Sequence, residues 1–159
     1  MKLSTYVTLA EATKSQTATR LGIDNIPPED VLENMKFVAR EVFDKVREFV
    51  GGPLAATSFY RSAELNAAIG GSSPTSQHMT GEAIDIDCDV FGFGDNMQIF
   101  AYISKNLEFD QVILEYPDKE GKPAWVHCSA KRAGLNRHQR LVKLKDKYVD
   151  FNNWAPGEV

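Results

Sequence analysis

The chain has 159 residues, which is most simply one domain and is long enough to bury about 70% of the surface that its unfolded form exposes. Hydrophobic residues at 43% and charged residues at 25% are ordinary values for a globular protein. The net charge of -4 argues against binding of nucleic acid, which needs a basic face, and no apolar run approaches the roughly 20 residues of a membrane span.

The N-terminal residues Met1–Tyr6 lack the apolar stretch of a secretory signal. We therefore expect synthesis in the cytoplasm, unless a leader has been removed. The only two cysteines, Cys88 and Cys128, both fall inside predicted strands. Buried free thiols are the favoured interpretation, with a disulfide or zinc ligation as alternatives.

The first fifty residues predict two helices. Thr8 and Glu11 form a capping box that starts a helix ending near Gly22. Pro27 and Pro28 start a second helix that runs to about Phe49. One apolar stripe follows this second helix at spacings of three and four: Val31, Met35, Val38, Val42, Val46 and Phe49.

The remainder predicts four strands and two further helices. The strands cover residues 54–60, 82–88, 110–116 and 124–129, and the helices cover residues 62–69 and 95–107. A Gly- and Ser-rich loop spans residues 70–76, and a turn-rich hairpin loop spans residues 117–123. The tail beyond Lys131 is basic, then aromatic, and gives only a weak prediction.

Each of three strands has an apolar side and a side that carries one polar candidate. Because side chains alternate along a strand, Asp85, Glu115 and His127 each lie opposite the apolar residues of their own strand. If the strands pair in one sheet, these three side chains converge on its outer face. The predicted fold class is α+β, an antiparallel sheet with helices on one face and a zinc cleft on the other.

Three side chains are candidate metal ligands. His78 and Asp85 lie seven positions apart across Gly81, which gives the backbone room to turn, and His127 follows in a later strand. A carboxylate in the middle of an apolar strand is costly unless it is paired or bound to a metal. Two imidazoles and one carboxylate predict a zinc site with an open position, where water-based hydrolysis takes place.

Five other residues fit either a functional or a structural role. Glu115 is the best-placed general base, although a solvent-facing glutamate is the alternative. Arg61, before the Ser-rich loop, suggests binding of an anion or carboxylate rather than a surface charge. Trp125 fits a pocket wall as well as the core, Asp87 fits a surface acid better than a partner of the site, and His138 fits a surface histidine better than a ligand.

The motifs together resemble the zinc D-alanyl-D-alanine carboxypeptidase family, which includes bacterial and bacteriophage peptidoglycan peptidases. The family's Ser-x-His-x-x-x-Gly-x-Ala-x-Asp signature is matched from Ser76 to Asp85 with one residue fewer before Gly81, and its Trp-x-His is matched by Trp125–His127. The segment Ser58–Ser62 resembles the family's Ser-Gly-Tyr-Arg-Ser, with Phe59 in place of Gly. The resemblance covers about residues 9–129.

The same metal site occurs in the Hedgehog signalling domain, which the segments Phe109–Glu115 and Val126–Ser129 also resemble. The resemblance implies that His78, Asp85 and His127 bind zinc and that Glu115 is the catalytic base. It also implies that Arg61 binds the substrate's terminal carboxylate and that Ser76 helps to position the peptide. Several family members carry the catalytic acid three residues before the last His, a position that is Ala124 here. Either Glu115 fills the role, which we favour because it falls on the correct strand face, or catalysis is impaired.

The sequence therefore predicts one zinc peptidase domain over residues 1–159, with a catalytic core at about residues 26–131. The expected protein is a monomer that hydrolyses D-Ala-D-Ala or related bonds in the stem peptides of peptidoglycan, with Zn²⁺ as cofactor. If Arg61 binds a terminal carboxylate, the activity is that of a carboxypeptidase; if it only braces the fold, an endopeptidase fits equally. The expected enzyme acts on the cell wall once released, for example as a phage-encoded endolysin. The alternatives are a non-catalytic zinc-containing binding module, a phage structural component, or a hydrolase of another small peptide or amide.

Overall fold

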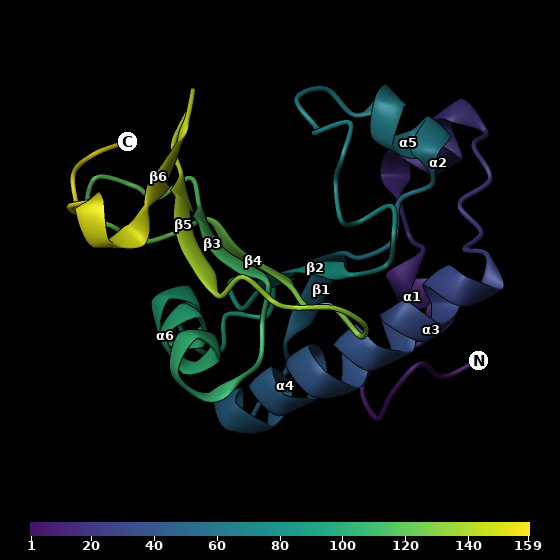
Figure 1. The fold of residues 1–159 in the computed structure, drawn as a ribbon, viewed down its shortest axis with the longest axis horizontal. Coiled ribbons are helices and arrows are strands. Elements are labelled where there is room, and N and C mark those ends of the chain that lie inside the picture. The colour runs from purple at the N-terminus through teal and green to yellow at the C-terminus, as the bar shows by residue number, and fades with distance from the viewer.

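A single mixed sheet forms the centre of the computed structural model, which describes all residues from Met1 to Val159 (Figure 1). Its strands are β1 (Ala55–Ser58), β2 (Ala83–Asp87), β3 (Gln111–Glu115), β4 (Trp125–Ser129), β5 (Gln139–Lys143) and β6 (Tyr148–Asp150), in the order β1-β2-β4-β3-β5-β6. Neighbouring strands are antiparallel except for β3 and β5, which are parallel. The α+β class is confirmed, and the expectation of a purely antiparallel sheet is corrected at that one pair.

Helices cover one face of the sheet. A continuous rod is formed by α3 (Glu29–Val38), the π-helical segment η1 (Ala39–Asp44) and α4 (Lys45–Val50), and α6 (Asn96–Asn106) packs beside α4 (Figure 1). The predicted apolar stripe on the rod is buried at Met35, Val38, Val42 and Val46. It packs in one cluster with the inward side chains of the strands: Ile84, Ile86, Val112, Leu114, Val126 and Cys128. This contact fixes which face of the sheet stays open.

Local capping sets most helix starts as predicted. Thr8 forms a capping box with Glu11 at α1 (Leu9–Ala12), Ser62 caps α5 (Ala63–Ala68), and Asp95 caps α6. The single helix expected up to Gly22 is wrong, because the chain leaves the helix after Ala12. Ser15 then caps a separate helix, α2 (Gln16–Leu21), whose last turn ends at Gly22 in a left-handed conformation.

The C-terminal tail adds elements that the sequence did not predict. The strands β5 and β6 extend the sheet beyond β3, and a short 3₁₀ turn, η2 (Phe151–Asn153), follows them. Figure 1 shows this end of the chain at one side of the sheet and the pair α2 and α5 at the other. Val142 and Leu144 carry the apolar core into this region.

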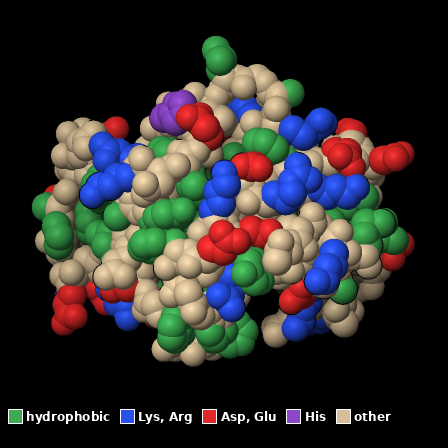
Figure 2. Space-filling model, turned by 90° about the horizontal axis from the view of Figure 1, so that it is seen from below, with side chains coloured by type: hydrophobic (Ala, Val, Ile, Leu, Met, Phe, Trp, Pro, Cys, Tyr) green, Lys and Arg blue, Asp and Glu red, His purple; other side chains and the backbone are tan.

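The two cysteines are buried and free, in agreement with the favoured interpretation. None of the helices combines the length and the apolar character that a membrane crossing requires. On the face that Figure 2 shows, acidic and basic side chains are interspersed with hydrophobic ones. This face therefore has no continuous basic surface of the kind that nucleic-acid binding needs.

Candidate metal centre

Strand register brings the predicted polar residues together on the open face of the sheet. Asp85 on β2 lies opposite His127 on β4, and His127 lies opposite Ile113 on β3. Two residues further along β3, Glu115 lies opposite Trp125 of β4. Side chains two residues apart share a face, so Glu115 is a diagonal neighbour of His127. The predicted convergence of these strands' polar residues is therefore observed.

The three predicted ligand residues form a tight cluster. One side-chain ligand atom from each of His78, Asp85 and His127 lies within 4.8 Å of the other two. His127 Nδ1 is 2.9 Å from Asp85 Oδ1, and His78 Nε2 is 3.4 Å from the same oxygen. The ligands of a tetrahedral zinc ion, at roughly 2.0–2.1 Å from the metal, lie roughly 3.3 Å apart. The donor set and its spacing therefore fit a zinc ion with little movement.

The orientation of His78 is set by its backbone surroundings. The side chain is almost fully buried, and its Nδ1 is 2.6 Å from the carbonyl oxygen of Phe59. Because a carbonyl only accepts, Nδ1 carries the proton and Nε2 presents its lone pair toward Asp85. The backbone N–H of Arg61 donates to the carbonyl of His78, which ties the same loop to the end of β1. A histidine fixed through its second nitrogen in this way is typical of metal ligands.

The protonation states also suit a metal. Burial lowers the pKa of His78, which favours the neutral imidazole that binds metals. Burial opposes ionisation of Asp85, but the electrostatic influence of His78 and His127 and the hydrogen bond from His127 outweigh it and hold the pKa of Asp85 below its usual range. Asp85 is therefore a carboxylate at neutral pH, as a ligand must be.

A second group of potential ligands, Asp87, Cys88 and Asp89, fits a metal less well. Burial raises the pKa of Cys88 to about 11, so its sulfur stays protonated at neutral pH. Asp87 instead accepts hydrogen bonds from the side chain of Asn96 and the backbone of Asp89. These contacts make Asp87 a brace between β2 and α6.

Glu115 is a buried carboxyl group beside the cluster. Only 8% of the residue is exposed, and it lines the same cavity as His78, Asp85 and His127. Burial raises the pKa of Glu115 to about 7, a shift that Asp85 reinforces and His127 opposes. A carboxyl group with this pKa can take up and release a proton near neutral pH.

The three predicted substrate-binding residues line a cavity of about 620 Å³ over the cluster. Arg61 lines it, and its Nε is buried without a hydrogen-bond partner. Ser76 also lines it, and its hydroxyl accepts a hydrogen bond from the backbone N–H of His78. Trp125 forms part of the wall and packs against Tyr116, with ring centroids 5.5 Å apart. His138 lies outside the cluster, half exposed, with Nε2 2.9 Å from a carboxylate oxygen of Glu108.

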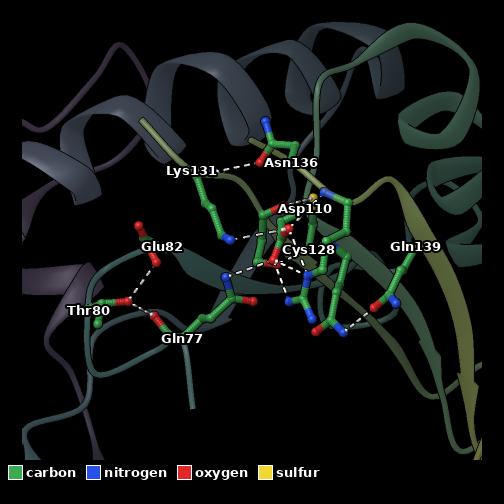
Figure 3. A network of polar contacts seen from close by, with 11 residues as sticks. Gln77, Thr80, Glu82, Asp110, Cys128, Lys131, Asn136 and Gln139 are labelled. Atoms are coloured by element: carbon green, nitrogen blue, oxygen red, sulfur yellow. Dashed lines mark hydrogen bonds and ion pairs between the residues drawn. The ribbon is translucent and has the colours of Figure 1, made fainter. Parts of the chain in front are cut away.

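Sequence reasoning missed a polar network at the edge of the cavity (Figure 3). Asp110 is fully buried, and its carboxylate accepts two hydrogen bonds from the Arg137 guanidinium and one from the Gln77 side chain. It also forms an ion pair with Lys131, whose Nζ lies 3.8 Å from Asp110 Oδ1. Gln77 precedes His78, so this network holds the loop that carries a candidate ligand. An aspartate beside an apolar strand run was the available signal, but its main partner, Arg137, lies in the weakly predicted tail.

Tyr116, Lys143 and Tyr148 also line the cavity and were not predicted. Lys143 Nζ lies 4.5 Å from the centre of the Tyr148 ring, and register places Lys143 beside Glu115. Tyr116 adopts a positive φ of 47° immediately after Glu115, an uncommon conformation for a residue with a side chain. These residues come from β3 and from the tail strands that the sequence did not reveal.

Comparison with known proteins gives one family. Residues 5–129 match the sequence profile described as Peptidase M15, which is more than half of the chain. A search of curated proteins gives no match. Among solved structures, the chain is similar to one described as "Structure of the LdcB LD-carboxypeptidase reveals the molecular basis of peptidoglycan recognition", with 21% identity and a TM-score of 0.34. That alignment covers 67% of this chain and 60% of the other, so this chain spans less than two thirds of that structure.

Proposed function

The chain belongs to the Peptidase M15 family, and from this premise we propose that it is a zinc peptidase that hydrolyses amide bonds in the stem peptides of bacterial peptidoglycan. The observation that carries the proposal is the convergence of His78, Asp85 and His127 beside the buried carboxyl group of Glu115. We propose that residues 1–159 form one domain, since a single sheet carries the whole site.

His78, Asp85 and His127 would hold the ion through Nε2, Oδ1 and Nδ1. When bound there, zinc supplies a Lewis acid that polarises the scissile carbonyl and increases the acidity of water. The hydrogen bond from His78 Nδ1 to Phe59 keeps the ring oriented for this role. Three protein ligands leave a fourth position free, which is the pattern of catalytic rather than structural zinc sites.

Glu115 would act as the general base and then as the general acid. Its carboxylate accepts a proton from the attacking water and delivers that proton to the departing amine. The raised pKa of about 7 supports both halves of this transfer, because the group is neither a very weak base nor a very weak acid at neutral pH. Several members of the family that the sequence resembles carry the catalytic acid at the position of Ala124, and we propose that Glu115 fills this role here.

The cavity suits a peptide that carries carboxylates. Arg61, Arg137 and Lys143 all line it, although the chain as a whole has a net charge of -4. The unpartnered Nε of Arg61 is a donor that a substrate carboxylate or carbonyl would satisfy. Stem peptides carry several carboxylates, and we propose that Arg61 binds one of them while Ser76 and Trp125 position the chain.

The test is hydrolysis of defined muropeptides by the zinc-loaded protein, with the products identified by mass spectrometry. Release of D-alanine would indicate carboxypeptidase action, and separation of cross-linked stems would indicate endopeptidase action. Glu115→Gln should retain zinc and lose turnover by roughly two to four orders of magnitude, whereas Glu108→Gln, an exposed glutamate, should behave as wild type. If the zinc-loaded wild type releases no product from any muropeptide, the protein is a binding module and the proposal is wrong.

A further inference from the structure

A second cavity, of about 690 Å³, adjoins the one over the metal ligands. The two cavities share Ser58, Arg61 and Ile69 in their linings. Arg61 therefore stands at the junction and does not close the far end of a single pocket. A substrate in the first cavity that extends past Arg61 would enter the second.

The second cavity follows the edge of a strand. All four residues of β1, Ala55–Ser58, line it. Consecutive side chains of a strand point to opposite faces, so a cavity lined by four in a row runs along the backbone edge. β1 is the outermost strand on this side of the sheet, with β2 as its only neighbour. Its outer edge therefore offers backbone N–H and C=O groups that the sheet leaves without a strand partner.

The edge strand β1 is short and has an irregular register, but it carries no charged or proline residue that would block strand pairing. Proteins commonly protect exposed edges with lysine, proline or inward-pointing charges. β1 carries only Ala55, Ala56, Thr57 and Ser58, which are small and uncharged, although the register shifts between Ala56 and Ser58. Small side chains allow another chain to approach closely.

The opposite wall is formed by the N-terminal region and by an exposed loop. Glu11, Lys14 and Gln16 contribute polar groups, and Val90 and Phe91, both more than half exposed, contribute apolar surface. The cavity thus lies between this wall and the edge of β1.

The position of the β1 edge relative to the metal ligands sets the number of substrate residues needed to reach from one to the other. Ser58 lies opposite Asp85 in the register of β1 and β2. A chain beside β1 is two strand spacings from β2, or about 10 Å, since neighbouring strands lie about 4.8 Å apart. An extended peptide covers this distance in about three residues at about 3.3 Å each.

We propose that the part of the substrate on the Arg61 side continues into the second cavity and pairs with the free edge of β1, beginning about three residues from the cleaved bond. This inference rests on the proposed function and deepens it: the substrate is a branched or cross-linked peptide, and the enzyme is an endopeptidase. Arg61 then binds a carboxylate or carbonyl within the chain, at the point where the chain passes between the two cavities.

The test compares hydrogen–deuterium exchange of zinc-loaded Glu115→Gln protein alone, with a stem pentapeptide, and with a cross-linked dimer of two stem peptides. The dimer should slow exchange of backbone amides in Ala55–Ser58 at least about threefold, because strand pairing protects them, and the pentapeptide should not. If both peptides protect the loop around His78 and neither protects β1, the inference is wrong and the proposed function stands. If neither peptide protects any segment, both are wrong.

A substitution that narrows the second cavity provides a second test of the inference. Gln16 is exposed, makes no side-chain hydrogen bond and lines the second cavity, so Gln16→Trp should narrow the cavity without loss of packing. Gln98→Trp, the same exchange in the first turn of α6 and outside both cavities, is the matched control. Wild type and the control should cleave the dimer with a kcat/KM about tenfold above that for the pentapeptide, as two or more added backbone hydrogen bonds imply. Gln16→Trp should lose this preference and retain pentapeptide cleavage; an unchanged preference in Gln16→Trp would overturn the inference.

Discussion

At the scale of single residues, the site gathers groups that would be costly in any other arrangement. His78 is almost fully buried, and Asp85 presents its carboxylate to both histidines. A carboxylate with little solvent exposure is destabilising without partners, and here two imidazoles supply them. The hydrogen bond from His78 to the Phe59 carbonyl fixes one ring before any ion arrives. Such preorganisation indicates a binding site and not an incidental cluster.

The raised pKa of Glu115 leads to a prediction about how the stability of the metal-free protein depends on pH. Burial raises its pKa from 4.5 to about 7, so the folded state binds the proton more tightly than the unfolded state. The stability that this proton confers is complete below about pH 4.5 and is lost as the pH rises through about 7. Glu115→Gln cannot ionise and should escape this loss. In EDTA, the variant should gain up to about 3 kcal/mol over wild type at pH 8 and little at pH 4.

The measurement is urea unfolding of both proteins at several pH values. The informative quantity is the difference between the two free energies of unfolding, because it removes the contributions of all other titrating groups. A difference that stays constant between pH 4 and pH 8 would show that Glu115 keeps an ordinary pKa, and its assignment as the base would lose its main electrostatic support.

At the scale of elements, the turn that joins the two ends of the Ser76–Asp85 motif depends on one glycine. Gly81 has a φ of 70°, and a Cβ built there would lie 2.7 Å from both Met35 Cγ and the Val31 carbonyl oxygen of α3. The backbone of this turn thus rests directly on the helical rod. No residue with a side chain fits without moving the loop of His78 away from β2.

Gly81→Ala should therefore destabilise the protein by about 2 kcal/mol or more and weaken zinc binding. Gly71→Ala is the matched control, because Gly71 has a similar φ of 78° but nothing within 4 Å of the added carbon. The control should lose only the free energy of unfolding that a residue with a side chain loses by adopting a positive φ, about 1 kcal/mol. Denaturant unfolding and zinc titration of the two variants check this, and equal losses in both would show that the close approach to α3 does not matter.

The network at Asp110 connects three elements near the site. Its carboxylate joins the start of β3 to Arg137 and Lys131 of the tail and to Gln77 of the ligand loop (Figure 3). Burial opposes the charge, but Arg137 and the other donors outweigh it and lower the pKa of Asp110 to about 2. This stabilising effect is present above about pH 3.8 and is lost as the pH falls toward 2.

Asp110→Asn should cost about 3 kcal/mol at pH 7, because the fully buried side chain loses the charge-assisted hydrogen bonds that Arg137 donates to it. The nearby pair of Glu108 and His138 is exposed, so Glu108→Gln should change stability by less than about 1 kcal/mol. Thermal unfolding of both variants at pH 7 tests the contrast. A similar small change in each would mean that the network contributes no more than a surface ion pair.

The elements also show what sequence reasoning could and could not supply. Period-2 alternation was enough to place Asp85, Glu115 and His127 on the open face, because their strands have a continuous apolar side. The pairing of β5 with β3 was not predictable, since Gln139–Lys143 alternates weakly and reaches its parallel position through a loop without a helix. Asp110 was missed for the same reason: its main partner, Arg137, is 27 positions away, and nothing local indicates the contact.

At the scale of the whole molecule, the two faces of one sheet have different roles. Its inner face packs on the helical rod and α6, and its outer face carries the ligands, Glu115 and the first cavity. The family match ends at residue 129, yet Arg137, Leu141, Lys143 and Tyr148 beyond it line that cavity. The proposed ligands and Glu115 therefore lie in the matched region, and the tail supplies part of the wall that would contact substrate.

The central claim is that His78, Asp85 and His127 bind one zinc ion, and metal content tests it most directly. Wild type and His138→Ala, purified and dialysed against zinc-buffered solution, should each contain close to one zinc per chain by mass spectrometry of the metal. His78→Ala and His127→Ala, confirmed as folded by circular dichroism, should contain almost none. Close to one zinc per chain in either of these folded variants, or none in wild type, would contradict the account.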